Sequence, residues 1–317
     1  MQKLPQKLSR QTLFSIISGL IGGVIFSVTA YTGNGGLLTV FLPVLPLALP
    51  GLAFGAKYTG YAAIAACAIV AAVIDGGSML VFAALTALPV VYLLRKLLLW
   101  RGEDGARQWH PVLPILAELA VISAAVFMMI AIAETYSEPG ELKTIISKEL
   151  ASNLKADNFD TDPQIAHFVK LLIDDWSFLI FAFASWLWVT MIYAFTVLAN
   201  ILLAQNNLAL RTKINLLPNG LPVWLLALVV ISGGLAFFGK GNDRYVGEAV
   251  FLMLLLPYFL AGIATIHLVS LQWKLRKFWL TVCYIALVLY PVLSVVAIAI
   301  GLYKQLQELK SHASPVK

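Results

Sequence analysis

The sequence predicts an all-α membrane protein, a polytopic bundle of about nine transmembrane helices with a small amphipathic helical insert outside the cytoplasm. Of its 317 residues, 60% are apolar and only 12% are charged, whereas soluble domains carry roughly 25% charged residues. Long uncharged runs cover most of the chain, and one crossing of a bilayer needs about 20 apolar residues. These observations exclude an ordinary soluble enzyme and make the lipid bilayer the expected surroundings.

Apolar runs bounded by glycine, proline and charged residues define the expected spans. They are residues 12–31, 37–55, 58–74, 78–94, 112–133, 176–203, 221–238, 246–271 and 278–303. If the second run enters the membrane and turns back, the number of spans falls to about eight. Residues 1–133 are then expected to form an N-terminal bundle of five spans, residues 176–303 a C-terminal bundle of four, and residues 304–317 a polar tail.

Basic residues favour a cytoplasmic N-terminus, because segments rich in Lys and Arg stay on the inner side of the membrane. In that orientation the inner segments contain Lys3, Lys7, Arg10, Lys57, Arg95, Lys96, Arg101, Arg107, Arg211, Lys213, Lys274, Arg276 and Lys277. The tail with Lys304, Lys310 and Lys317 would lie outside and is the exception. We therefore expect a multi-pass membrane protein whose N-terminus is cytoplasmic.

No motif in the sequence supports catalysis, a metal site or nucleic-acid binding. The net charge of +6 is spread in short clusters between apolar runs, as orientation in a membrane requires. Cys67 and Cys283 lie in separate apolar runs without a nearby His, and neither a zinc-protease motif nor a nucleophile elbow occurs. We expect no enzyme, no metal, no cofactor and no nucleic-acid partner.

Residues 134–175 form the only long polar segment between the spans. Leu142, Ile146 and Leu150 recur at helical spacing in its first half. In its second half, Asp162 and Pro163 are suitable first residues of another amphipathic helix. This outer insert is expected to be a lid or a docking surface for a partner, or else a helical hairpin that buries its apolar stripe on the bilayer or on the spans.

The second apolar run carries Pro43, Pro46, Pro50 and Gly51 within nine residues. Each proline lacks an N–H donor and disfavours the helical conformation of the residue before it. Unwound backbone at membrane depth is tolerated where protein buries it or where a cavity holds water, and broken helices often surround transporter sites. These four residues are therefore the candidate lining of a small-molecule cavity; the alternative is a kinked helix that only packs.

Glu118 is the one acidic residue inside the fifth expected span. A charge at the bilayer centre costs about 2.5–3.5 kcal/mol on the insertion scale, so Glu118 should be paired, protonated or close to the inner surface. We include it among the candidate cavity residues as a group that couples protons or cations. The structural alternative is an ion pair with Arg95 or Lys96.

The first span places Ser15, Gly19, Gly23 and Ser27 four residues apart. Such a stripe of small side chains allows a neighbouring helix to approach closely. The neighbour could be another helix of this chain or a partner membrane protein that docks on the first helix, so the stripe is a candidate docking surface.

These features resemble the YybS-like family of predicted bacterial membrane proteins, whose function is not established. The resemblance implies that the protein lies in the bacterial cytoplasmic (inner) membrane. The resemblance rests on FLPVLPLALPGLAFG in the second run, on Asp75-Gly76-Gly77 after the third, on the insert, and on LLPNGLPVW before the seventh. The first six spans are more distantly similar to the substrate-binding component of energy-coupling-factor transporters. In that family a small-residue stripe on the first helix meets a coupling protein, which implies the same role for Ser15, Gly19, Gly23 and Ser27.

The sequence thus leads to two hypotheses about function. The first is a component that binds or transports a small molecule and has no ATPase of its own. The second is an assembly or scaffold protein that transports nothing and holds partners through the outer insert and the first helix.

Overall fold

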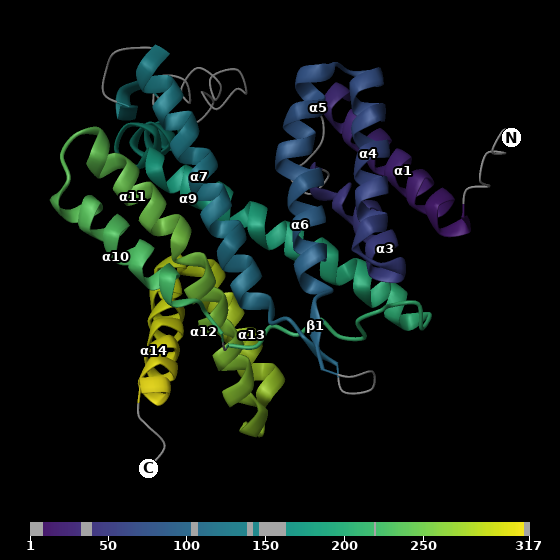
Figure 1. The fold of residues 1–317 in the computed structure, drawn as a ribbon. Coiled ribbons are helices and arrows are strands. Elements are labelled where there is room, and N and C mark those ends of the chain that lie inside the picture. The colour runs from purple at the N-terminus through teal and green to yellow at the C-terminus, as the bar shows by residue number, and fades with distance from the viewer. Residues whose placement is uncertain are drawn as a thin grey trace, which may run out of the picture. The chain divides into compact units, whose positions relative to one another are not determined.

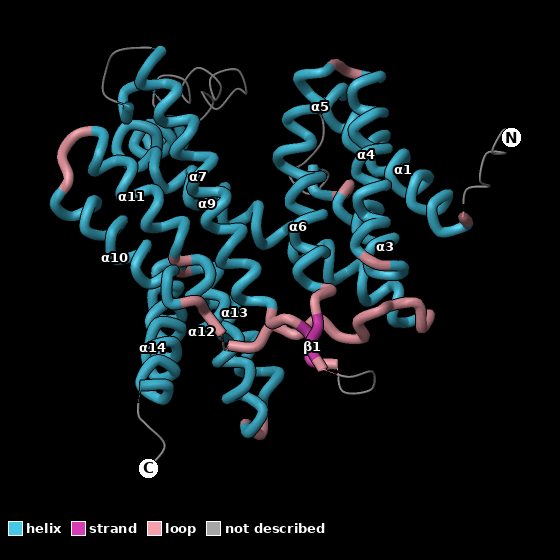
Figure 2. The backbone as a smooth tube through the Cα atoms, in the orientation of Figure 1, coloured by secondary structure: helices cyan, strands magenta, loops and turns pink. Residues whose placement is uncertain are grey.

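In the computed structural model, the described residues are 9–32, 40–102, 107–137, 142–145, 163–218 and 220–313. Nearly all of them are helical (Figures 1 and 2). Within these residues, seven helical segments are long and apolar enough to cross a membrane: Arg10–Thr32, Ala56–Val73, Gly76–Leu97, Val112–Ala133, Trp176–Gln205, Asn242–Gln272 and Pro291–Ser311. The chain is therefore an all-α, multi-pass membrane protein, as predicted.

Contacts divide the chain into two compact units, which are described separately. Unit 1 comprises Met1–Ile115 with Thr190–Asn215, and unit 2 comprises Leu116–Val189 with Leu216–Lys317. The units therefore do not follow the N-terminal and C-terminal bundles that the order of the spans suggests.

Unit 1 is a helical bundle in which helix α1 packs along helix α4. Its elements are α1 (Arg10–Thr32), α3 (Val44–Phe54), α4 (Ala56–Val73), α5 (Gly76–Phe82), the π-helix η1 (Ala83–Ala87) and α6 (Leu88–Leu97). Leu47, Ala62 and Leu93 are fully buried in its core. Asp75 caps α5, since its carboxylate accepts a hydrogen bond of 2.7 Å from the Ser78 N–H, which lowers the pKa of this carboxyl.

A buried arginine joins the end of α6 to the loop that follows α9. The short antiparallel strands β1 (Trp100–Arg101) and β2 (Gln108–Trp109) follow α6. Arg211 is 6% exposed, and its Nη1 donates to the carbonyls of Leu97, at 2.9 Å, and of His110, at 3.1 Å. The last carbonyls of a helix have no partner within it, so Arg211 supplies one from a distant part of the chain.

Unit 2 contains the remaining helices, two of which pack through glycines. Its elements are α7 (Val112–Ser137), α9 (Pro163–Gln205), α10 (Val223–Phe238), α11 (Asn242–Leu254), α12 (Leu256–Val269), η3 (Ser270–Gln272), α13 (Arg276–Leu289), η4 (Pro291–Leu293) and α14 (Ser294–Ala313); α7 and α9 each extend into unit 1. Gly262 of α12 lies against the backbone of Ala297, and Gly301 of α14 lies against the backbone of Tyr258. Small residues thus permit close helix approach here.

Two predicted spans are shorter in the structure than a membrane crossing. The second run forms α3, which has 11 residues and a length of about 16 Å, against about 30 Å of hydrocarbon. The seventh forms α10, with 16 residues. The number of crossings, nine or eight, therefore stays a prediction.

The prediction of one continuous helix over residues 278–303 is wrong. Helix α13 ends at Leu289, and Tyr290 has φ −128° and ψ 80°. Pro291 explains the break, because proline removes a backbone donor and disfavours a helical residue before it. Helix α14 then continues to Ala313, so the first ten residues of the predicted polar tail are helical as well.

Half of the predicted insert, residues 138–141 and 146–162, lies outside the described residues. Its described parts are residues 134–137, which form the end of α7, the helical residues 142–145, and the first part of α9, which begins at Pro163 as predicted. The second piece of the insert is a helix of its own, as predicted. Trp176, whose φ and ψ are not helical, separates residues 163–175 from the span Trp176–Gln205, although α9 includes both.

Candidate functional site

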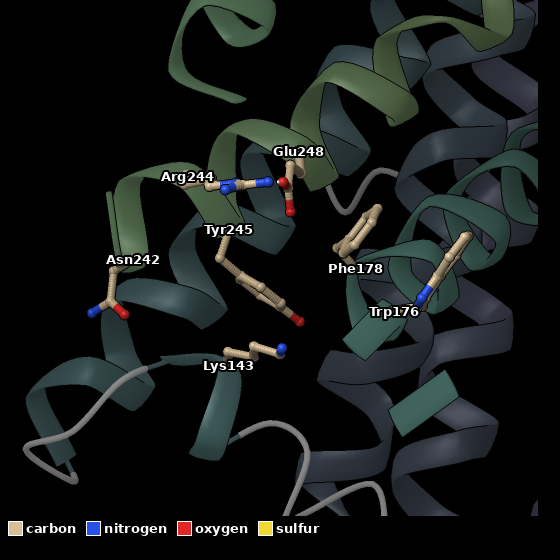
Figure 3. A pocket seen from close by; sticks show the side chains of 8 residues that line it. Lys143, Trp176, Phe178, Asn242, Arg244, Tyr245 and Glu248 are labelled. Atoms are coloured by element: carbon tan, nitrogen blue, oxygen red, sulfur yellow. Dashed lines mark hydrogen bonds and ion pairs between the residues drawn. The ribbon is translucent and has the colours of Figure 1, made fainter. Parts of the chain in front are cut away.

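A cavity of about 530 Å³ lies at one end of unit 2 (Figure 3), and we call it the insert-end pocket. Three elements surround it: residues 142–145 of the insert, the kink in α9, and the turn between α10 and α11. Its lining residues are Lys143, Trp176, Phe178, Gly241, Asn242, Arg244, Tyr245 and Glu248. Trp176 and Asn242 are also the first residues of two membrane spans, which indicates that the pocket lies near the membrane surface.

Local backbone geometry creates the space for this pocket. Gly241 has φ 54° and ψ −127°, a conformation that is essentially restricted to glycine. It lets the chain reverse after α10 and start α11 at Asn242. Trp176, with φ −129° and ψ 20°, interrupts α9 on the opposite side of the pocket.

Two hydrogen bonds connect the three elements. The hydroxyl of Tyr245, which is 4% exposed, donates to Oγ of the fully buried Ser177 at 3.0 Å and so joins α11 to α9. Oδ1 of Asn242 accepts a hydrogen bond of 2.8 Å from the backbone N–H of Leu142. Since buried polar groups are costly when unpaired, both contacts help to hold the walls of the pocket in place.

The polar lining combines charges of both signs with aromatic rings. Arg244 Nε and Glu248 Oε1 form an ion pair of 2.8 Å, and Lys143 contributes a second cation. The ends of Lys143 and Tyr245 point toward the side where Trp176 and Phe178 lie (Figure 3). The lining thus offers charged groups of both signs beside aromatic rings. Within the described residues, no group of three or more His, Cys, Asp or Glu could hold a metal ion.

A second hollow of about 530 Å³ adjoins this pocket, and we call it the apolar hollow. Its lining residues are Met128, Ala131, Ile132, Leu142, Leu235, Asn242, Asp243 and Val246. Asn242 lines both spaces, and Leu142 and Lys143 place consecutive residues of the insert on the two sides. A polar and an apolar space therefore meet at the Asn242–Leu142 hydrogen bond.

The proline-rich second run is tightly packed in unit 1. Pro43, Pro46, Pro50 and Gly51 are all buried. The carbonyl of Pro46 would normally accept from residue 50, but Pro50 has no N–H; the hydroxyl of Ser18 on α1 donates to it instead, at 2.9 Å. Gly51 lies directly against the Thr59 side chain. This packing favours the interpretation of a kinked packing helix over that of a ligand cavity at these four positions.

The structure also shows where the two other groups of candidate residues lie, namely Glu118 and the small-residue stripe of α1. Glu118 is partly buried in α7 and belongs to unit 2, whereas the four second-run residues belong to unit 1.

The small-residue stripe, Ser15, Gly19, Gly23 and Ser27, is buried along α1. Gly19 and Gly23 lie against the backbone carbonyls of α4. The helix that packs on the stripe is α4 of the same chain, which favours a neighbour from this chain over a partner protein.

Sequence reasoning did not select the residues of the insert-end pocket. One signal for them was present: the predicted topology places the insert and the loop at residues 239–246 on the same side of the membrane, and Trp176 at the end of a span. Nothing in the pattern showed that Tyr245 and Ser177 form a hydrogen bond, because 68 residues separate them in the chain.

Comparison with protein-family models, with curated proteins and with solved structures found no match for this chain. The resemblance to the YybS-like family and to energy-coupling-factor components therefore stays a prediction from the sequence.

Proposed function

We propose that this membrane protein is the ligand-binding component of a small-molecule transport system and has no ATPase of its own. The observation that carries the proposal is the insert-end pocket. Its volume lies within the range of about 300–1,000 Å³ typical of small-molecule sites. Its polar groups come from three elements that hydrogen bonds connect, an arrangement that suits selective binding.

A thermal-shift screen of water-soluble small molecules on the full chain in detergent tests ligand binding. A ligand at a hundredfold excess over its Kd stabilises the folded state by about 2.7 kcal/mol, so we expect at least one compound to raise the Tm clearly. Trp176→Ala should abolish this rise because it removes an aromatic wall of the pocket. The matched control is Trp279→Ala, on α13: Trp279 is 50% exposed, against 56% for Trp176, and does not line the pocket.

Uptake of the identified compound into proteoliposomes then tests transport. Uptake with the chain and its native partners, together with loss of uptake in Trp176→Ala, would support the proposal. If no compound stabilises the wild-type chain, or if both tryptophan variants respond alike, the pocket is not a ligand site.

The rival function is a scaffold that holds partner proteins. One observation bears on it: the face of α1 opposite the stripe is apolar and exposed, with Ile17, Ile21 and Val28 each about half exposed. Cross-linking at this face in cells separates the two functions, because stoichiometric capture of one partner protein, without any stabilising small molecule, would favour the scaffold.

A further inference from the structure

We infer that helix α13 (Arg276–Leu289) does not cross the membrane and that the basic residues at its start bind the headgroups of anionic phospholipids. These residues and the two tryptophans beside them form what we call the basic anchor: Trp273, Lys274, Arg276, Lys277 and Trp279. The basic anchor follows the end of the span Asn242–Gln272, whereas the insert-end pocket lies at the start of that span. The inference therefore does not depend on the proposed function.

The helices on either side of α13 form an antiparallel pair. Gly262 of α12 lies against Ala297 of α14, and Gly301 of α14 lies against Tyr258 of α12. The end of α12 and the start of α14 therefore lie at the same end of the pair. A helix that connects them begins and ends on one side of the membrane. With its 14 residues, α13 is also only about 21 Å long, against about 30 Å of hydrocarbon.

Two hydrogen bonds hold α13 beside the end of α12. Nε of Arg276 donates to Oγ of Ser270 at 3.2 Å, and the hydroxyl of Tyr284 forms a hydrogen bond of 2.6 Å with Nε2 of His267. From Arg276 to Tyr284 the helix rises about 12 Å, whereas the chain from His267 to Ser270 rises only about 5 Å. Helix α13 therefore runs obliquely across the end of α12.

Helix α13 has no buried residue and exposes large apolar side chains. Phe278 is 57% exposed, Ile285 53% and Val288 79%. Beyond Lys277, the helix carries no charged residue. Continuous apolar surface of this kind is unfavourable in water, and a helix at the membrane surface covers it with acyl chains. The basic start of α13 thus belongs at the headgroups and its apolar second half in the hydrocarbon.

The charges of the basic anchor favour anionic lipid as its partner. Lys274, Arg276 and Lys277 supply three positive charges within four residues, and residues 249–307 contain no Asp or Glu. No ion pair in the described part of the chain involves these three residues. Lys274 and Lys277 are exposed, so they are available to the negative surface of a membrane. A second copy of this chain would instead bring three more cations to the same place and be repelled.

The tryptophans of the basic anchor agree with this position. Trp273 is 42% exposed and Trp279 is 50% exposed, one on each side of the cations. Indole rings favour the headgroup region, where their apolar body and their polar N–H are both accommodated. The two rings therefore place the start of α13 at the level of the headgroups.

Cysteine labelling tests whether α13 stays on one side. In the background of Cys67→Ala and Cys283→Ala, Lys277→Cys and Tyr290→Cys place single thiols at the two ends of the helix. A membrane-impermeant maleimide should reach Lys277→Cys from one side of the membrane and should never reach Tyr290→Cys from the other. Labelling of the two positions from opposite sides would show that α13 crosses and would overturn the inference.

Fluorescence quenching by brominated lipids tests the preference for anionic headgroups. In the same background, a bimane on Thr281→Cys, an exposed position one turn after Lys277, reports on the lipids beside α13. The full chain is placed in phosphatidylcholine vesicles that contain brominated phosphatidylglycerol or brominated phosphatidylcholine. Attraction to an anionic surface amounts to about fivefold in affinity for each basic residue. We therefore expect phosphatidylglycerol to be preferred at least about fivefold, and less so at about 1 M salt, where charges are screened.

Matched double variants assign this preference to the basic anchor. Lys274→Gln with Lys277→Gln should lower it about fivefold. Lys304→Gln with Lys310→Gln removes the same charge from the far part of α14, beyond Gly301, which lies beside the start of α12, and should leave the preference unchanged. An unchanged Tm shows that each variant folds.

Three results would overturn the inference. Equal quenching by the two brominated lipids would show that headgroup charge is not recognised. An equal loss of preference in both double variants would show that it arises from overall charge and not from the basic anchor. Absence of quenching by either lipid would show that protein, such as a second copy of this chain, covers α13.

Discussion

Some polar side chains in this protein donate hydrogen bonds to backbone carbonyls at or near helix breaks. Ser18 donates to the carbonyl that Pro50 cannot serve. The indole N–H of Trp186 donates to the carbonyl of Leu252 at 2.8 Å, close to the break between α11 and α12. Because membrane hydrocarbon offers no water, each unpaired group there costs several kcal/mol. At the Pro46 carbonyl the donor from α1 replaces the missing one, and at the Leu252 carbonyl, which also accepts from the Leu255 N–H, the indole adds a second hydrogen bond.

Gln305 is the clearest case, since it has partners on two other elements. It is 3% exposed, its Oε1 accepts from the Tyr258 hydroxyl at 2.8 Å, and its Nε2 donates to the carbonyls of Pro222, at 3.0 Å, and Leu221, at 3.3 Å. It thereby connects α14 to α12 and to the start of α10.

We expect Gln305→Met to destabilise unit 2 by about 1–3 kcal/mol, the cost of leaving buried partners unsatisfied. Thermal unfolding of the purified chain measures this loss. The control is Gln307→Met on the same helix, because Gln307 is exposed and its amide donates to the hydroxyl of Tyr303, which is exposed as well. Equal stability of the two variants would show that the buried hydrogen bonds contribute nothing.

Pairs of helices associate where small residues bring their backbones together. In unit 1, Gly19 and Gly23 of α1 lie against Ala62 and Ala66 of α4. Hydrophobic burial cannot drive this association within lipid, so close packing must. The same arrangement recurs between α12 and α14 in unit 2, which explains why glycine, a poor helix former, is kept inside these spans.

Two alanine substitutions test the packing of α1 on α4. A Cβ at Gly19 would collide with the Ala62 carbonyl, whereas a Cβ at Gly60 would meet nothing within 4 Å. We expect Gly19→Ala to destabilise unit 1 by about 1–3 kcal/mol through overpacking, and Gly60→Ala to be neutral or to stabilise by about 0.5–1 kcal/mol. Unfolding in a denaturing detergent measures both, and a neutral Gly19→Ala would contradict the close approach.

Across the whole molecule, the distribution of Lys and Arg predicts which end faces the cytoplasm. Arg101 and Lys143 lie on either side of the 22-residue span Val112–Ala133, so they should face opposite sides of the membrane. The predicted orientation places Arg101 inside, with its basic neighbours, and Lys143 outside.

Cysteine labelling in intact cells tests this orientation. In a background of Cys67→Ala and Cys283→Ala, a membrane-impermeant maleimide should label Lys143→Cys before permeabilisation and Arg101→Cys only afterwards. The reverse pattern would invert the topology, and labelling of both positions in intact cells would show that α7 does not cross.

Much of the fold was predictable from local patterns. Apolar runs correctly predicted the helices α1, α4, α7 and the membrane-spanning part of α9, and Pro163 correctly predicted where a helix begins. The candidate site could not be predicted from local patterns. Sequence drew attention to Pro43, Pro46 and Pro50 because prolines break helices, but it could not show that Ser18 supplies the missing donor.

The amino-acid sequence by itself determined that this chain is a helical membrane protein. The length and apolarity of a segment are local properties, and in lipid they require the backbone to form its hydrogen bonds within a helix. Only the tertiary structure decided which surfaces are used. It placed α4 on the small-residue stripe of α1, and it brought Lys143, Trp176 and Tyr245 around one pocket. Such pairings depend on which distant segments meet, and that depends on the packing of side chains across the whole fold.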